Sequence, residues 1–189
     1  TVYNAGSPPW ATADGTGGWL ADHSPPIDVL YVPGPRQQVL IAAYVAEAGD
    51  GLIGVDLAGR KLWGVRWVGG HWTGASHLAR DASPRADADV LAYAASAWHV
   101  DTDSGPQRRG EVRLAAIAED AQRVVLKHVV ASREEAEVGG LAACNGRLVA
   151  ALPALKQLLW VDAAARKIVA TTPMDEPRGV AFDASGRLL

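Results

Sequence analysis

The chain has 189 residues, of which 49% are hydrophobic and 21% charged, so it is expected to fold around a core rather than to remain disordered. Its 18 basic and 21 acidic residues leave a net charge of −3 without a Lys/Arg run, so we expect no nucleic-acid partner. The longest apolar stretch, 147–161, is interrupted by Pro, Lys and Gln and falls short of the ~20 residues of a membrane span, so no span is predicted.

Residues 1–25 form a leading segment rich in Trp, Gly and Pro. The sequence begins at Thr1 with no initiator methionine or signal peptide, so we expect a processed chain or a fragment of a larger protein. Few lysines, seven Trp and a single cysteine favour an extracytoplasmic location, in a secreted or cell-surface protein.

Short apolar strings that end in turn-forming residues recur along the rest of the chain. They are spaced by about 40 to 60 residues, and periods of roughly 40 to 50 are typical of propeller blades. The four strings are IDVLYVPG (27–34), SHLARDAS (76–83), GGLAACNG (139–146) and RGVAFDAS (178–185).

Each of the first three strings is followed by a second apolar run and then by a hairpin pattern, which makes four strands per unit. The Ala-rich run 89–98 has helical propensity, but its apolar residues on both alternating faces favour a buried strand. One predicted hairpin turns at Asp56 to Gly59. The sequence therefore predicts an all-β chain, a β-propeller with about three four-stranded blades and the start of another. The predicted blades are 26–72, 73–135, 136–175 and the partial 176–189.

The string EPRGVAFDASGRLL (176–189) resembles the blade opening of NHL-type and gluconolactonase-like six-bladed propellers. The resemblance covers the repeat units only, and it implies a fold rather than a particular activity. Three blades cannot close a ring of 4 to 8. We therefore expect remaining propeller blades, or self-association, to complete it.

The innermost strand of each blade lines the central channel of a propeller, and small residues near its start allow the strands to crowd together. Gly140 and Gly179 fit that role. In the first two strings the equivalent positions hold titratable side chains, Asp28 and His77. They predict a polar site at the channel mouth for a small anionic or hydroxylated ligand. The alternative is a water-filled channel that tolerates any polar residue. The residues predicted to form this site are Asp28, His77, Ser76 and Arg178.

Two loops place Trp beside acidic or histidine residues, a combination suited to carbohydrate because a flat indole stacks on sugar rings. The spacing of these residues matches no metal-binding motif, so neither a metal nor another cofactor is predicted. Cys144 stands in an apolar string and is predicted to be a small core residue. The candidate ligand-binding residues of the loops are Asp22, His23, His71, Trp10, Trp19 and Trp72.

These patterns favour a non-catalytic recognition or scaffold module that binds a glycan or small polar ligand. The alternative is a propeller-type polysaccharide lyase or a hydrolase or lactonase, in which His77 or His23 acts as general base and Asp28 or Asp22 as its partner. A third hypothesis is a purely structural repeat segment with no ligand.

Overall fold

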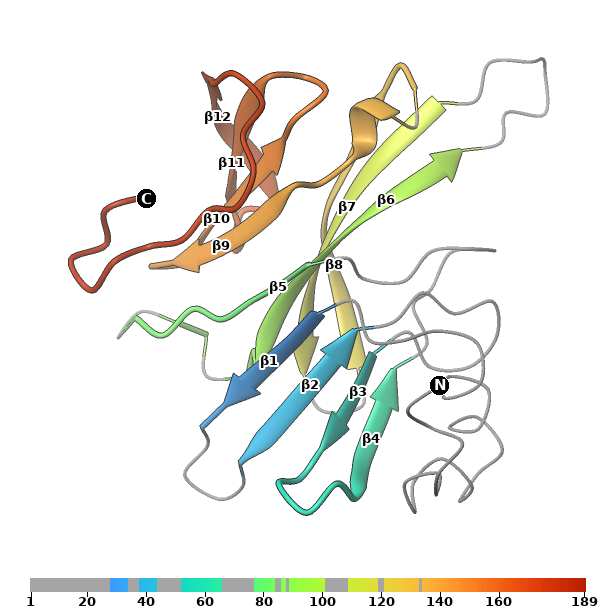
Figure 1. Cartoon of the computed structure of the whole chain (residues 1–189), viewed down its shortest axis with the longest axis vertical. Helices are drawn as coiled ribbons and strands as arrows, with labels where there is room; N and C mark the ends of the chain where they lie inside the picture. The colour runs from blue at the N-terminus through green and yellow to red at the C-terminus, as the bar shows by residue number, and fades with distance from the viewer. Residues whose placement is uncertain are drawn as a thin grey trace. The chain divides into compact units, whose positions relative to one another are not determined.

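The computed structural model describes residues 28–33, 38–43, 52–65, 77–83, 86–87, 89–100, 109–118, 121–132 and 134–189. The chain divides into two compact units, one of residues 1–76 with 119–122 and the other of residues 77–118 with 123–189. Within the described ranges no residue is α-helical, and no helix could cross a membrane. The prediction of an all-β chain with three four-stranded antiparallel units is confirmed. Figure 1 shows the strands of each sheet side by side in chain order.

Sheet A belongs to the first unit. It consists of β1 (Asp28–Val32), β2 (Val39–Ala43), β3 (Leu52–Val55) and β4 (Lys61–Val65). Alternation along β1 leaves Val29 and Tyr31 exposed, whereas β2 and β3 are buried almost throughout and supply the core residues Ile41 and Leu52. Trp63 of β4 is also buried.

Sheet B consists of β5 (His77–Ala79), β6 (Ala92–Val100), β7 (Arg109–Ala118) and β8 (Ala121–Val130). The Ala-rich run is a strand: β6 pairs with β7 over nine residues, from Ala92 opposite Ile117 to Val100 opposite Arg109. Residues 92–96 are buried on both faces. Helical propensity is outweighed here because small side chains let the strand lie between two packed layers.

Sheet C consists of β9 (Gly140–Cys144), β10 (Arg147–Leu152), β11 (Gln157–Asp162) and β12 (Lys167–Pro173). The single-turn 3-10 helix η2 (Glu134–Ala136) lies between β8 and β9. β10 is almost fully buried, β11 combines buried and half-buried residues, and most of β12 is exposed. The burial gradient identifies β12 as the outer edge of the sheet.

Sheets B and C share one hydrophobic core. Tyr93 and Leu114 of sheet B belong to the same buried cluster as Leu141, Leu148 and Leu159 of sheet C. Burying a side chain of this size contributes about 1.5–3 kcal/mol, so this cluster is the main cohesive element of the second unit.

The segment after β12 covers the other face of sheet C. Val180, Phe182 and Leu188 pack against Val149, Ala151 and Leu158, and the ring of Phe182 meets that of Trp160 edge-on with centroids 6.3 Å apart. Only a single bridge, Phe182 opposite Leu188, pairs this segment with itself.

Two glycines permit this segment to approach β9. A Cβ atom added at Gly140 would lie 2.9 Å from the Cα atom of Gly179, closer than side chains tolerate. Gly179 itself has φ +66°, a conformation that residues with a Cβ atom rarely adopt, and its N–H donates to the carbonyl of Gly139 at 2.9 Å. The expectation that small residues let these strands crowd together holds at this pair.

Candidate functional site

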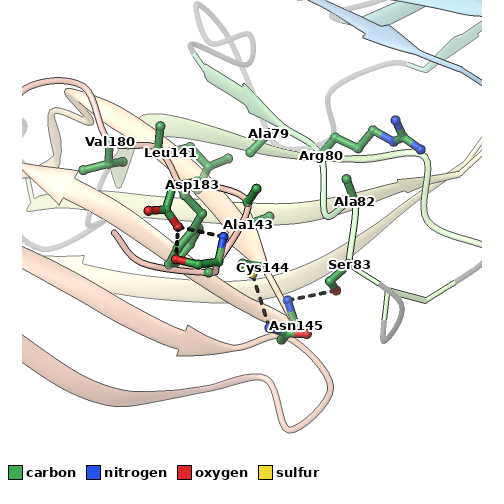
Figure 2. Close-up of a pocket in the computed structure, with 16 residues that line it drawn as sticks. Ala79, Arg80, Ala82, Ser83, Leu141, Ala143, Cys144, Asn145, Val180 and Asp183 are labelled. Carbon is green, nitrogen blue, oxygen red and sulfur yellow. Dashed lines mark hydrogen bonds between the residues drawn. The ribbon is translucent and has the colours of Figure 1, made fainter. Parts of the chain in front are cut away.

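A cavity of about 490 Å³ lies where three neighbouring segments of the second unit end. Its walls come from the end of β5, from β9 and its turn, and from residues 180–186. Figure 2 shows side chains of all three segments around it. Much of the lining is small and apolar, with Leu141, Val180 and Phe182 the larger members, and the polar groups lie in the three turns. The volume falls within the range of small-molecule sites.

Asp81 joins two of these segments. It is buried at the end of β5, and its Oδ2 accepts the N–H of Gly146 at 2.7 Å, while Oδ1 accepts those of Ser83 at 3.0 Å and Asn145 at 3.2 Å. Burial raises the pKa of Asp81, but hydrogen bonds from the Ser83 hydroxyl and from these backbone N–H groups outweigh it and hold the pKa below its usual value. The carboxylate is thus an anionic link between sheets B and C.

Asp183 occupies the corresponding place in the third segment. Its Oδ1 accepts the N–H groups of Ser185 and Arg187, both at 2.9 Å, and the Ser185 hydroxyl at 2.6 Å. The guanidinium Nε of Arg187 donates to Oδ2 at 3.1 Å. The Ser185 hydroxyl is the largest of the hydrogen-bond contributions that lower the pKa of Asp183. Its donors all belong to its own turn, which fixes the carboxylate at the cavity wall.

The same construction occurs in sheet A. Asp56 accepts the N–H groups of Ala58 and Arg60 on Oδ1, both at 2.9 Å, and the Arg60 Nε on Oδ2 at 2.7 Å. In each case a glycine one residue before the arginine has φ near +80°, Gly59 at 81° and Gly186 at 78°. The predicted turn at Asp56 to Gly59 is confirmed, and Asp-X-X-Gly-Arg is a turn-building pattern of this chain.

Cys144 lines the cavity. The prediction of a core residue is not met: the side chain is half-buried, and its Sγ accepts the side-chain amide of Asn145 at 3.3 Å. A Cβ atom added at Gly186 would lie 3.6 Å from this Sγ, so the thiol adjoins the 183–187 turn. The apolar string signalled burial, but Cys144 is the last residue of β9, where the strand leaves the core.

Arg80 is the cationic member of the lining. Figure 2 shows its guanidinium group extending away from the side chains of Cys144, Asn145 and Asp183. The cavity walls therefore offer hydroxyl, amide, thiol and carboxylate groups beside apolar surface, a set that suits an uncharged polar ligand better than an anion.

Three predicted site residues lie in the described ranges. His77 begins β5 and is half-buried, and its Nε2 lies 2.8 Å from the carbonyl oxygen of Val138, to which it donates. Arg178 is exposed and contacts the neighbouring Glu137, with Nη1 and Oε1 3.4 Å apart. Asp28, in sheet A, accepts the N–H of Val29 at 2.8 Å.

His77 and Arg178 thus meet the same short segment, 137–138, just before β9. None of these three residues lines the cavity, which lies toward the ends of the first strands rather than at their starts. The other predicted residues lie outside the described ranges; they are Ser76, Asp22, His23, His71, Trp10, Trp19 and Trp72.

Sequence inspection missed the cavity although it carried a signal for it. The tripeptide Asp-Ala-Ser occurs at 81–83 and again at 183–185, at matching places in two of the repeated strings; the whole second copy lines the cavity, and so do Ala82 and Ser83 of the first. Turn propensity alone explains such residues, so the repetition was the informative feature. Among the residues that the structure describes, no group of three or more His, Cys, Asp and Glu side chains is arranged to hold a metal ion.

Models of known protein families give no match to this chain, and a search of curated proteins finds none either. The function must therefore be argued from the geometry of the site itself.

Proposed function

We propose that this chain is a β-propeller segment with NHL-like or gluconolactonase-like blades, and that it serves as a recognition or scaffold module in a secreted or cell-surface protein. Three features support the propeller. Each sheet runs in simple chain order, sheets B and C share a core, and the first strand of sheet C lies against the 179–183 segment through Gly140. An experimental structure in which the sheets share no common axis would contradict it.

The ligand site in this proposal is the cavity at the strand ends. The observation that carries it is the combination of a volume of about 490 Å³ with carboxylates that are already engaged. Asp183 in the cavity wall, and Asp81 beside the lining residues Arg80 and Ala82, accept backbone N–H groups, which hold them ionised and fixed. Such groups orient a ligand but are poorly suited to moving protons near neutral pH. A small glycan or another hydroxylated molecule is the class that fits.

The alternative of a lyase, hydrolase or lactonase receives no specific support from the described residues. His77 has one ring nitrogen on the Val138 carbonyl, and Asp28 accepts the N–H of the adjacent Val29. His23 and Asp22 lie outside the described ranges, so that pair remains a prediction.

Calorimetric titration against a panel of mono- and oligosaccharides tests the proposed site. Ala82→Trp fills the cavity from an exposed position in its wall, whereas Ala164→Trp places the same ring in the exposed β11–β12 turn as a control. We expect binding heat in the native chain and the control, and none in Ala82→Trp. Equal heat in all three proteins would move the site elsewhere, to the loop tryptophans, and turnover of a sugar would support the enzyme hypothesis.

A further inference from the structure

The β9–β10 turn has two backbone donors that its own sheet cannot satisfy. Asn145 and Gly146 have φ of 53° and 73°, and the strands that they join pair Cys144 with Arg147. In a two-residue turn of this kind the N–H groups of the two turn residues point away from the ladder. Gly146 is half-buried, so its N–H needs an acceptor that sheet C does not provide, whereas Asn145 is exposed.

Sheet B supplies that partner through Asp81 and Ser83. Gly146 donates to Asp81 Oδ2, and Asn145 donates to both Asp81 Oδ1 and the Ser83 hydroxyl oxygen, the latter at 3.0 Å. This contact, which we call the Asp-Ser clasp, fixes how the first hairpin of sheet C lies against the end of β5.

The acceptor half of a second clasp is present in the 179–189 segment. Asp183 and Ser185 repeat the Asp-Ala-Ser tripeptide after the strand that lies beside β9. Hydrogen bonds within its own turn hold Asp183 ionised. Within the described part of the chain its Oδ2 accepts a hydrogen bond only from the Arg187 Nε, and 23% of its side-chain surface is exposed. A carboxylate oxygen accepts two donors, so Oδ2 has room for one more.

We propose that Asp183 and Ser185 accept the two outward N–H groups of a tight turn in a further antiparallel sheet, which stacks on the 179–183 segment as sheet C stacks on sheet B. The partner is thus a β-hairpin whose two turn residues both carry an N–H. The inference rests on the proposed propeller for one point only, namely that the further sheet stacks on the 179–183 segment.

The sheets of a second copy of this chain do not fit the requirement. The Asn145–Gly146 donors are already taken by Asp81 and Ser83, and the matching turn of sheet A begins with Pro33, which has no N–H. In sheet B the N–H of Ser83 is taken by Asp81. Within the described ranges the first hairpins thus lack the two N–H groups, and the partner that we propose is a β-hairpin from outside those ranges.

A cyclic peptide provides the probe. It carries the sequence of residues 142–149 with serine in place of the cysteine, closed into a hairpin so that its Asn-Gly turn is preformed. A second peptide has an ester in place of each turn amide, which removes both N–H donors and leaves the shape. Amide shifts of Ser185 and Arg187 in the native chain, followed by NMR, report binding at Asp183.

We expect millimolar amide peptide to shift both signals, and the ester peptide or Asp183→Asn to weaken binding about tenfold or more, since a hydrogen bond to a carboxylate is lost. Asp162→Asn is the matched control, because Asp162 also accepts a turn N–H, that of Ala165 at 2.7 Å, but lies in the β11–β12 turn. It should leave binding unchanged.

Absence of shifts at millimolar peptide, equal binding of the two peptides, or binding that survives Asp183→Asn would each overturn the clasp. These outcomes concern Asp183 alone. A chain that fails this test could still bind sugar in the cavity and still have radially arranged sheets, so the failure is distinguishable from failure of the proposed function.

Discussion

The contact between sheets B and C at Asp81 is a quantitative test of the structure. In the native chain the Gly146 nitrogen lies 2.7 Å from Asp81 Oδ2. Asp81→Asn keeps one side-chain oxygen for the N–H groups of Ser83 and Asn145 but turns an amide N–H₂ toward the N–H of Gly146. Gly146 then loses its acceptor. Leaving a donor of this kind without a partner costs about 1–3 kcal/mol.

The cost is concentrated at Gly146 because Asn145 has a second acceptor. Its N–H lies 3.0 Å from the Ser83 hydroxyl oxygen, which the Asp81 substitution does not remove. We therefore expect Asp81→Asn to lower the free energy of unfolding by about 2 kcal/mol, and Ser83→Ala alone by less than about 1 kcal/mol. The double variant should cost more than the sum, since Asn145 then depends on a single neutral amide oxygen.

The effect has a predictable pH dependence. Hydrogen bonds place the pKa of Asp81 below its unfolded value of about 3.9, so the stabilisation is complete above that pH and is lost as the pH falls through the lower folded pKa. The difference between native chain and Asp81→Asn should be constant above about pH 5 and shrink below about pH 4.

Urea unfolding followed by circular dichroism at neutral and acid pH measures both quantities. Asp162→Asn, at an exposed turn, is the control and should change stability little. If Asp81→Asn unfolds with the native chain at pH 7, or if the difference between them grows in acid, the clasp is not an ionised link between the two sheets.

Three further changes give sharp outcomes. Gly140→Ala should lower the free energy of unfolding by about 1–3 kcal/mol, because its Cβ atom would meet the Gly179 Cα at 2.9 Å; denaturant unfolding that matches the native chain would disprove the close approach. Alkylation of Cys144, the single cysteine, should slow several-fold in Ala82→Trp and stay unchanged in Ala164→Trp, and mass spectrometry of the labelled chain measures the rate. His77→Ala should cost about 1 kcal/mol through the lost bond to the Val138 carbonyl while sugar binding in the cavity is retained; calorimetry that shows lost binding would return His77 to the site.

Local patterns predicted the strands well. The run 89–98 was identified as a strand because its apolar residues fill both alternating faces, and the Asp56 turn because Asp and Gly suit a reversal before a basic residue. These inferences require only neighbours along the chain. The four-strand order follows because consecutive antiparallel strands are joined by short turns.

The site depends on neighbours that are far apart in sequence. Asp81 contacts Gly146, which lies 65 residues further along the chain, and His77 contacts Val138, which lies 61 residues further along. Hydropathy cannot say which end of a first strand opens into a cavity. The sequence therefore pointed to the start of the strand, at His77, whereas the cavity lies beyond its end, at Ala82 and Ser83.

The Asp-X-X-Gly-Arg turn serves two different positions: it joins the third and fourth strands of sheet A, and it joins Phe182 to Leu188, which form the single bridge of the 179–189 segment. In both copies the Asp carboxylate accepts hydrogen bonds from residues of its own turn, so the motif can form at any chain reversal. Its presence therefore indicates a turn but does not indicate which strands of a repeat the turn joins. Aligning relatives by this motif alone would superimpose segments that hold different places in the repeat, and the order of the strands within each sheet is the safer landmark for counting modules.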